Sequence, residues 1–409
     1  MIRQDSDVLD KTLRVLLGLD ENQALPFFTD AHDFDATRPA AVIAINPSDR
    51  DSGDLFRAGY TQQKRFALLP SRSSLRWLLP QVAKRRGIDG LQIYMPHGHV
   101  GRLVKALIVQ ARATGWQGWV RDTAMIASTK PLPIEKLLCE VTGEKQIFLS
   151  LSPGTPGAYQ KLTVQAMRHD GSILGYLKLP MTMAADARLR NEAAVVEELF
   201  TYPELRAHIP RLLFAGSLQG RYAVLQSPLE GKEGPRKYDP LHELFLERLH
   251  RCRFELRSGS HLVDETAAKW NGEATKLDLG WQALGREALR IAAQELEGSE
   301  VPCGISHGDF APWNTRIDED ALRLFDWESA CWNAPLLWDK FHFMTQTECL
   351  LHVRHGLETA PHSRGKNRGL YLLYLLDSAR QFWAESAEKV VIQYRRTQLE
   401  KFIAERHAA

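Results

Sequence analysis

Three oxygen-bearing side chains in one short stretch are the residues best suited to chemistry. The segment His307 to Asn314 reads His-Gly-Asp-Phe-Ala-Pro-Trp-Asn, and Asp326 follows twelve residues after Asn314. A short loop would hold Asp309 and Asn314 close together. The apolar run that ends at Phe325 predicts a strand, and a hairpin there would return Asp326 beside them. A carboxylate beside a hydroxyl, with further oxygen ligands for a divalent cation, is what phosphoryl transfer requires.

Each part of this pattern also has an ordinary explanation. An Asp and an Asn five residues apart occur by chance in loops. Gly308 at positive φ could form a simple turn, with Asp309 capping a neighbour. The combination with Asp326-Trp327-Glu328 at this spacing is much rarer. We therefore favour the chemical interpretation.

The segment resembles the aminoglycoside phosphotransferase and choline kinase-like family, small-molecule relatives of the protein kinases. These enzymes read H-G-D where protein kinases usually read H-R-D, and D-W-E or D-x-E where protein kinases read D-F-G. Both variants are present here. The resemblance implies that Asp309 is the catalytic base and that Asn314 and Asp326 bind metal. It also implies Mg²⁺ and ATP as cofactors, with GTP as the alternative nucleotide. Asp339 matches an Asp that often follows the D-x-E motif, and we expect it to cap a helix or brace the loop.

A loop rich in glycine and proline precedes these motifs. Strands are predicted over Ile147–Leu151 and Tyr159–Met167, and the loop between them contains Gly154 and Gly157. Glycines let backbone N–H groups approach phosphates, which makes both candidates for nucleotide binding. The spacing is not G-x-G-x-x-G, and two prolines in the loop remove donors. An ordinary hairpin turn is the alternative.

Lys178 lies between apolar residues on the next predicted strand, and a helix is predicted over Asp186–Phe200. The resemblance implies that Lys178 pairs with Glu192 of this helix, which would hold the ammonium against the α- and β-phosphates of the nucleotide. A solvated lysine is the alternative. Glu197 and Glu198 are rivals for the pairing, although their positions predict a solvated face.

The element pattern predicts an α+β fold. The resemblance implies a bilobal protein kinase-like fold, with a β-rich N-lobe over 143–230 and a helical C-lobe over 231–409 that contains the catalytic loop. Residues 1–142 are expected to form a small separate α/β or α+β domain of unassigned role that can be removed as a unit. Within it, strands are predicted over Ala40–Ile45 and Leu91–Met95, and helices over Leu75–Arg86 and Val100–Thr114.

The N-terminal part is locally basic. The residues responsible are Arg57, Lys64, Arg65, Arg72, Arg76, Lys84, Arg85 and Arg86. A basic face could bind a phosphorylated or acidic ligand, but a solvated surface is the favoured explanation.

Composition limits the class of protein. The chain has 409 residues, 44% hydrophobic and 25% charged, with a net charge of +2. That balance is typical of a globular protein and does not indicate nucleic acid as a partner. The five cysteines are scattered without a C-x-x-C pair, which favours reduced thiols in the cytoplasm. We expect no secretory signal and no membrane span.

These features together predict an ATP- and Mg²⁺-dependent small-molecule kinase that phosphorylates a hydroxyl group. A sugar, an amino alcohol and an aminoglycoside-like compound all remain open as the acceptor, and the oligomeric state is open as well. The alternative is a catalytically silent kinase-like nucleotide-binding or scaffold protein that acts through its N-terminal domain. A protein kinase is less favoured, because no A-P-E segment follows Asp326.

Overall fold

A computed structural model of the chain describes residues 5–20, 22–28, 39–81, 90–94, 99–114, 120–274, 277–355, 365–384 and 389–408. The chain divides into two compact units. The first comprises residues 1–193 and 211–228, and the second comprises residues 194–210 and 229–409.

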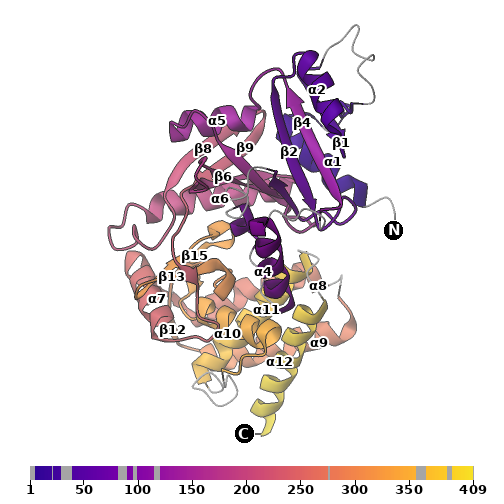
Figure 1. Ribbon diagram of the computed structural model, residues 1–409. Helices are drawn as coiled ribbons and strands as arrows, with labels where there is room; N and C mark the ends of the chain where they lie inside the picture. Colours follow the sequence, from indigo (N-terminus) through magenta and orange to yellow (C-terminus); the bar gives the residue numbers. More distant parts are fainter. Residues whose placement is uncertain are drawn as a thin grey trace. The chain divides into compact units, whose positions relative to one another are not determined.

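The first unit contains one large antiparallel sheet (Figure 1). Its nine strands have the order β1-β4-β2-β3-β5-β6-β7-β9-β8. The strands are β1 (Ala41–Ile45), β2 (Gln62–Leu69), β3 (Trp77–Pro80), β4 (Asp122–Ser128), β5 (Phe148–Ser152), β6 (Lys161–Met167), β7 (Ile173–Pro180), β8 (Leu212–Leu218) and β9 (Arg221–Gln226). The other elements of this part are α1 (Asp5–Leu17), α2 (Asp49–Arg57), η1 (Gly90–Ile93), α4 (His99–Thr114), α5 (Pro133–Thr142) and α6 (Met183–Leu199), whose last turns belong to the second unit.

Strand β1 shows how sequence alternation builds two apolar layers. Ile43 points into a core that it shares with Leu13 of α1, whereas Val42 faces the opposite side and joins a smaller cluster with Leu55 of α2. Successive side chains of a strand point to opposite faces, so an apolar run such as Ala41–Ile45 can be buried on both.

The separate N-terminal domain predicted for residues 1–142 is not shown. Strand β3 pairs with β5, with Leu78 opposite Leu151, so the sheet continues across the expected boundary at 142/143. One apolar core contains Leu13 and Leu68 from the N-terminal part together with Val164 from the expected N-lobe. The edge of β5 thus receives a partner from residues 1–142, a long-range pairing that local sequence patterns do not reveal.

Two local predictions in this part are wrong. The helix expected over Leu75–Arg86 is instead strand β3 at Trp77–Pro80, because pairing with β2 and β5 overrides local preference; residues 82–89 lie outside the described part. The strand expected over Leu91–Met95 is the short helix η1, in which Leu91 is buried, and Met95 lies outside the described part. The predictions for β1 and α4 are confirmed.

The second unit is mainly helical. Its helices are α7 (Pro240–Cys252), α8 (Gly259–Ala274), α9 (Leu279–Leu296), α10 (Trp338–Leu351), α11 (Gly365–Ala384) and α12 (Lys389–Ala408), with short helices η2 (Pro312–Asn314) and η3 (Trp327–Ser329). Two small sheets accompany them, formed by β10 (Lys232–Glu233), β13 (Thr315–Asp318) and β14 (Ala321–Leu324), and by β11 (Phe254–Ser258), β12 (Glu300–Ser306) and β15 (Cys331–Pro335). The predicted change from a strand-rich to a helix-rich part of the chain is confirmed.

The helices of this unit enclose one apolar core. Its central helix is α11, which packs against α8, α9 and α12 and buries a continuous run from Leu370 to Leu376. Capping residues set the starts of two helices. The Asp239 carboxylate accepts from the N–H groups of Leu241 and His242 in α7, and the Asp278 carboxylate accepts from the Trp281 N–H in α9. In the described part of the chain, no helix has the length and apolar character needed to cross a bilayer.

Candidate active site

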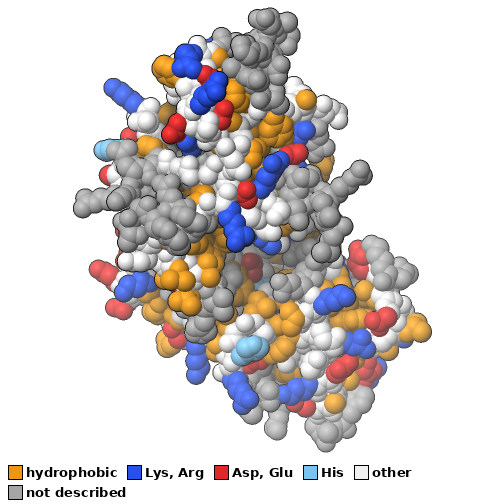
Figure 2. Space-filling model, turned by 45° about the vertical axis from the view of Figure 1, so that its right-hand side comes forward, with side chains coloured by type: hydrophobic (Ala, Val, Ile, Leu, Met, Phe, Trp, Pro, Cys, Tyr) orange, Lys and Arg blue, Asp and Glu red, His pale blue; other side chains and the backbone are white. Residues whose placement is uncertain are grey.

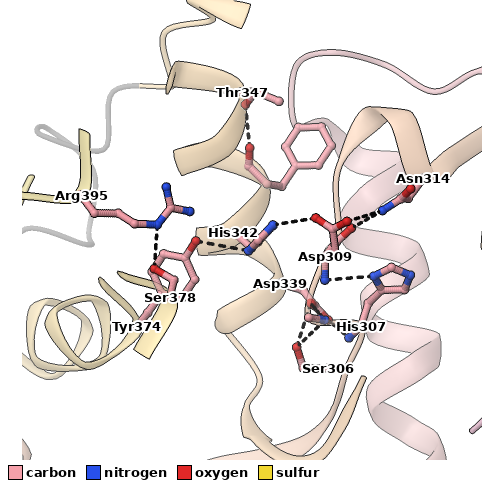
Figure 3. A network of polar contacts seen from close by, with 12 residues as sticks. Ser306, His307, Asp309, Asn314, Asp339, His342, Thr347, Tyr374, Ser378 and Arg395 are labelled. Atoms are coloured by element: carbon pink, nitrogen blue, oxygen red, sulfur yellow. Dashed lines mark hydrogen bonds and ion pairs between the residues drawn. The ribbon is translucent and has the colours of Figure 1, made fainter. Parts of the chain in front are cut away.

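The loop between β12 and η2 holds Asp309, the predicted base. The Asn314 side-chain amide donates to the Asp309 carboxylate at 2.8 Å and to the Asp309 carbonyl at 2.9 Å, which closes the loop. The second carboxylate oxygen, Oδ1, lies 3.1 Å from Nε2 of His342 on α10 (Figure 3). The Asp309 side chain keeps 37% of its surface exposed, so a substrate can reach the carboxylate.

Asp339 braces the backbone on which Asp309 is mounted. One of its carboxylate oxygens accepts from the Ser306 hydroxyl at 2.8 Å and from the Gly308 N–H at 3.1 Å. The other accepts from the His307 N–H at 2.8 Å. The expected bracing role of Asp339 is confirmed.

Gly308 explains why a glycine precedes the base in this loop. Its φ is +78°, and a Cβ atom there would lie 2.2 Å from the carbonyl oxygen of Ser329. No other residue fits this close backbone approach without displacing the loop.

His307 connects the loop to the second motif, a role that the sequence analysis did not assign. Its ring is fully buried, with Nε2 lying 3.0 Å from the Phe325 carbonyl and Nδ1 accepting from the Asp309 N–H at 3.2 Å. The ring also packs edge-on against Trp327, with 4.7 Å between the centroids. Burial lowers the pKa of His307, which agrees with a neutral ring that donates through Nε2 and accepts through Nδ1.

The hairpin predicted to return Asp326 to the loop is confirmed. Strands β13 and β14 pair antiparallel, with Thr315 opposite Leu324 and Asp318 opposite Ala321. The Phe325 N–H then donates to the Asn314 carbonyl at 3.1 Å. Asp326 itself adopts a left-handed conformation, with φ +69° and ψ +56°. That conformation is unfavourable for a residue with a Cβ and is concentrated at functional sites.

The oxygen atoms near the end of this hairpin suit a hard divalent cation. The side-chain nitrogen of Asn314 donates two hydrogen bonds, both to Asp309. Among the described residues, none donates a hydrogen bond to the Asn314 Oδ1. Carboxylate oxygens of Asp326 and Glu328 lie within 4.8 Å of each other. Carboxylate and amide oxygens are the ligand types that Mg²⁺ prefers, so the residue types of the predicted ligands Asn314 and Asp326 suit the ion. Glu328, which lies beside Asp326, was not predicted as a ligand.

A hydrogen bond from His342 keeps the Asp309 carboxylate ionised. Burial alone would raise the pKa of Asp309, but the hydrogen bond from the His342 ring leads the effects that outweigh burial, and the pKa lies below its usual value. A carboxylate with this low pKa is ready to accept a hydrogen bond from a hydroxyl at neutral pH.

The first unit contains the predicted Lys178–Glu192 pair. Lys178 lies on β7 and its Nζ is 2.5 Å from the Glu192 Oε1 of helix α6. The two side chains are 9% and 0% exposed, so the solvated alternative for Lys178 is excluded. Glu197 and Glu198, the rival partners, are exposed.

The structure places Gly154 and Gly157 in the loop between β5 and β6, as predicted. Gly154 has a φ of +66°, and a Cβ atom there would lie 2.9 Å from the Lys161 carbonyl oxygen. Gln160 closes the loop through its side-chain amide, which donates to the Pro153 carbonyl at 3.0 Å. The packing of the loop on itself therefore accounts for Gly154, and phosphate binding by either glycine remains a prediction.

Three of the five described basic residues named for the N-terminal part are paired with acids. Lys64 lies 2.7 Å from Glu135, Arg65 lies 3.2 Å from Asp49, and Arg57 pairs with Asp54. On the face drawn in Figure 2, basic and acidic side chains are interspersed. These pairs favour the solvated-surface explanation over a binding face; residues 84–86 lie outside the described part.

Comparison with known families supports the assignment from motifs. Residues 176–339 match the family described as the phosphotransferase enzyme family. The resemblance to this family is confirmed. The matched segment contains both the Lys178–Glu192 pair and the loop from His307 to Asn314.

Solved structures of aminoglycoside phosphotransferases are also similar to the chain. One is a thermostable mutant of APH(4)-Ia in its apo form, with 16% identity and a TM-score of 0.47, covering 67% of this chain and 100% of that one. Another is the GDP and kanamycin complex of APH(2")-IIia, with 12% identity and a TM-score of 0.44, covering 67% and 99%. Comparison with curated proteins gives no match.

Proposed function

We propose that this protein is a kinase that transfers the γ-phosphoryl group of ATP to a hydroxyl of a small molecule. The observation that carries the proposal is the arrangement around Asp309. Its carboxylate is ionised, partly exposed and held by donors on both oxygens, within a segment that matches a phosphotransferase family.

Each side chain of the site has one role in the proposed reaction. The acceptor hydroxyl donates to the Asp309 carboxylate, and its oxygen attacks the γ-phosphorus as the bond to the β,γ-bridging oxygen breaks. The proton of the hydroxyl passes to Asp309, and the nucleoside diphosphate leaves with the bonding electrons. Lys178, held by Glu192, would bind the α- and β-phosphates.

The expected metal ligands are Asn314 and Asp326. Bound Mg²⁺ supplies neutralisation of the charge on the phosphate oxygens. Carboxylate and amide oxygens are ligand types that Mg²⁺ prefers, so both side chains could bind the ion directly. We further propose that the protein is cytoplasmic. In the cytoplasm ATP is a commoner phosphoryl donor than GTP, so we propose ATP as the donor.

An ATPase-coupled screen of small hydroxyl compounds tests this function. Sugars, amino alcohols and aminocyclitols should be supplied separately with Mg²⁺ and ATP. At least one class should stimulate ADP release, and Asp309→Ala should lower that turnover by ~10²-fold or more while nucleotide binding changes little. A stimulated rate that Asp309→Ala leaves intact would remove Asp309 from the mechanism, and no stimulation by any class would favour a silent scaffold.

A further inference from the structure

His342 contacts the base of the proposed reaction from a helix outside both sequence motifs. It lies one turn after Asp339 on α10, and residues three apart share a helix face. Asp339 therefore binds the backbone of the loop while His342 reaches the Asp309 carboxylate, with Nε2 3.1 Å from Oδ1. One face of α10 holds the loop at two points (Figure 3).

The chemistry of these contacts determines which ring nitrogen carries the proton. An ionised carboxylate only accepts hydrogen bonds, so Nε2 of His342 must donate to Asp309. In the neutral ring Nδ1 is then an acceptor, and it lies 3.4 Å from the hydroxyl of Tyr374, which can donate. The chain of donations runs from Tyr374 through His342 to Asp309.

The packing around the imidazole leaves it little freedom to turn. His342 is 5% exposed and lies nearly parallel to the ring of Phe382, with 6.5 Å between centroids. The ring of Tyr374 meets it edge-on at 6.2 Å. A ring held in this way fixes the direction of its N–H bond.

We propose that His342 is a positioning residue for phosphoryl transfer, which orients the Asp309 carboxylate toward the acceptor hydroxyl. The inference rests on the proposed function of Asp309. His342 does not take the proton from Asp309, because Nε2 already carries the hydrogen of the bond between them. With Asn314 holding Oδ2 and His342 holding Oδ1, the plane of the carboxylate is fixed, and each oxygen keeps one lone pair for substrate.

Three variants at this position separate orientation from simple packing. His342→Gln places an amide N–H near the original Nε2, whereas His342→Asn places one near Nδ1, too short to reach Asp309. His342→Leu fills the space without a donor. We expect Leu and Asn to lower kcat by about 10²-fold with KM values changed less than about threefold, because misplaced catalytic groups act on the transition state. We expect Gln to stay within about tenfold of the wild-type kcat.

The Asp309→Ala background supplies the matched control. If His342 acts through Asp309, adding His342→Leu to Asp309→Ala should not lower kcat further, because effects of residues that work as a unit are not additive. An equal loss in both backgrounds, a kcat of His342→Leu close to wild type, or a Gln variant as impaired as Leu would each overturn the inference. All three outcomes leave the function of Asp309 standing.

A nuclear magnetic resonance measurement decides the matter without turnover. In protein with ¹⁵N-labelled histidines, the ring signal that is missing from the His342→Gln spectrum identifies His342. This signal should show the Nε2–H form, and Asp309→Ala should shift the signal of the Nε2 proton. The Nδ1–H form in the wild type would overturn the inference. Should no acceptor be phosphorylated, the proposed function fails by itself, and this spectrum still tests the contact.

Discussion

The bracing carboxylate of Asp339 allows a prediction whose size follows from the structure. Its two oxygens receive three hydrogen bonds from one short stretch, from the Ser306 hydroxyl and from the backbone N–H groups of His307 and Gly308. All the partners lie at the start of the loop that holds Asp309, and Asp339 itself is 1% exposed. The substitution to test is Asp339→Asn, which keeps the shape of the side chain.

The amide can satisfy only part of this set. If its oxygen takes the place that serves Ser306 and Gly308, its NH₂ group faces the His307 N–H, and two donors meet. One charge-assisted hydrogen bond is lost and one buried N–H is left unpaired, so the free energy of unfolding should fall by about 2–4 kcal/mol. For a unit of this size the melting temperature should fall by roughly 4–16 °C. The loop should also shift, and kcat should fall by ~10-fold or more.

Thermal unfolding and turnover of the purified variant check both parts. Asp320→Asn is the matched control, because Asp320 is exposed on the turn of the β13–β14 hairpin. It should change the melting temperature by no more than about 2 °C, as expected for a surface substitution. If Asp339→Asn melts and turns over like the control, the three hydrogen bonds do not hold the loop.

Three further outcomes are expected. Lys178→Ala should lower the free energy of unfolding by roughly 3–5 kcal/mol, because it leaves the buried Glu192 carboxylate unpaired. Lys178→Met combined with Glu192→Leu should regain most of that stability without regaining turnover. Urea unfolding measures both variants, and an unchanged Lys178→Ala would refute the pairing. Deleting residues 1–142 should yield insoluble or unfolded protein in an expression and circular dichroism test, because it removes part of the shared core, and a folded fragment would restore the separate domain. Burial lowers the pKa of His355 from 6.5 to about 4. As pH falls, the unfolded chain therefore binds a proton at this residue before the folded chain does, and stability should fall between about pH 6.5 and 4. His355→Gln should flatten this part of the curve of stability against pH, whereas the control His169→Gln, on an exposed turn, should not.

The sequence was sufficient to predict the local structure around Asp309, because the residues of this loop are close along the chain. Asp309, Asn314 and Asp326 fall within eighteen residues, and a loop followed by a hairpin joins them. The pairing of Lys178 with Glu192 was predictable for a similar reason, since a strand and the next helix carry them.

Contacts made by distant segments could not be predicted from local patterns. His342 reaches Asp309 from helix α10, where it lies between Phe341 and Phe343 in the sequence, and its spacing from the motif carries no signal. Strand β3 was mistaken for a helix because its pairing with β2 and with β5, about seventy residues later, makes it a strand. The pairing with β5 also joins the N-terminal part to the expected N-lobe.

The most direct test of the central claim is the effect of ATP and Mg²⁺ on thermal stability. A ligand that binds only the folded state, at one hundred times its Kd, stabilises it by ~2.7 kcal/mol, which a melting curve resolves. ATP with Mg²⁺ should raise the melting temperature of the wild type, and omitting Mg²⁺ or introducing Asp326→Ala should remove most of the increase. No increase with ATP or GTP, with or without Mg²⁺, would contradict the proposal that this protein is a kinase.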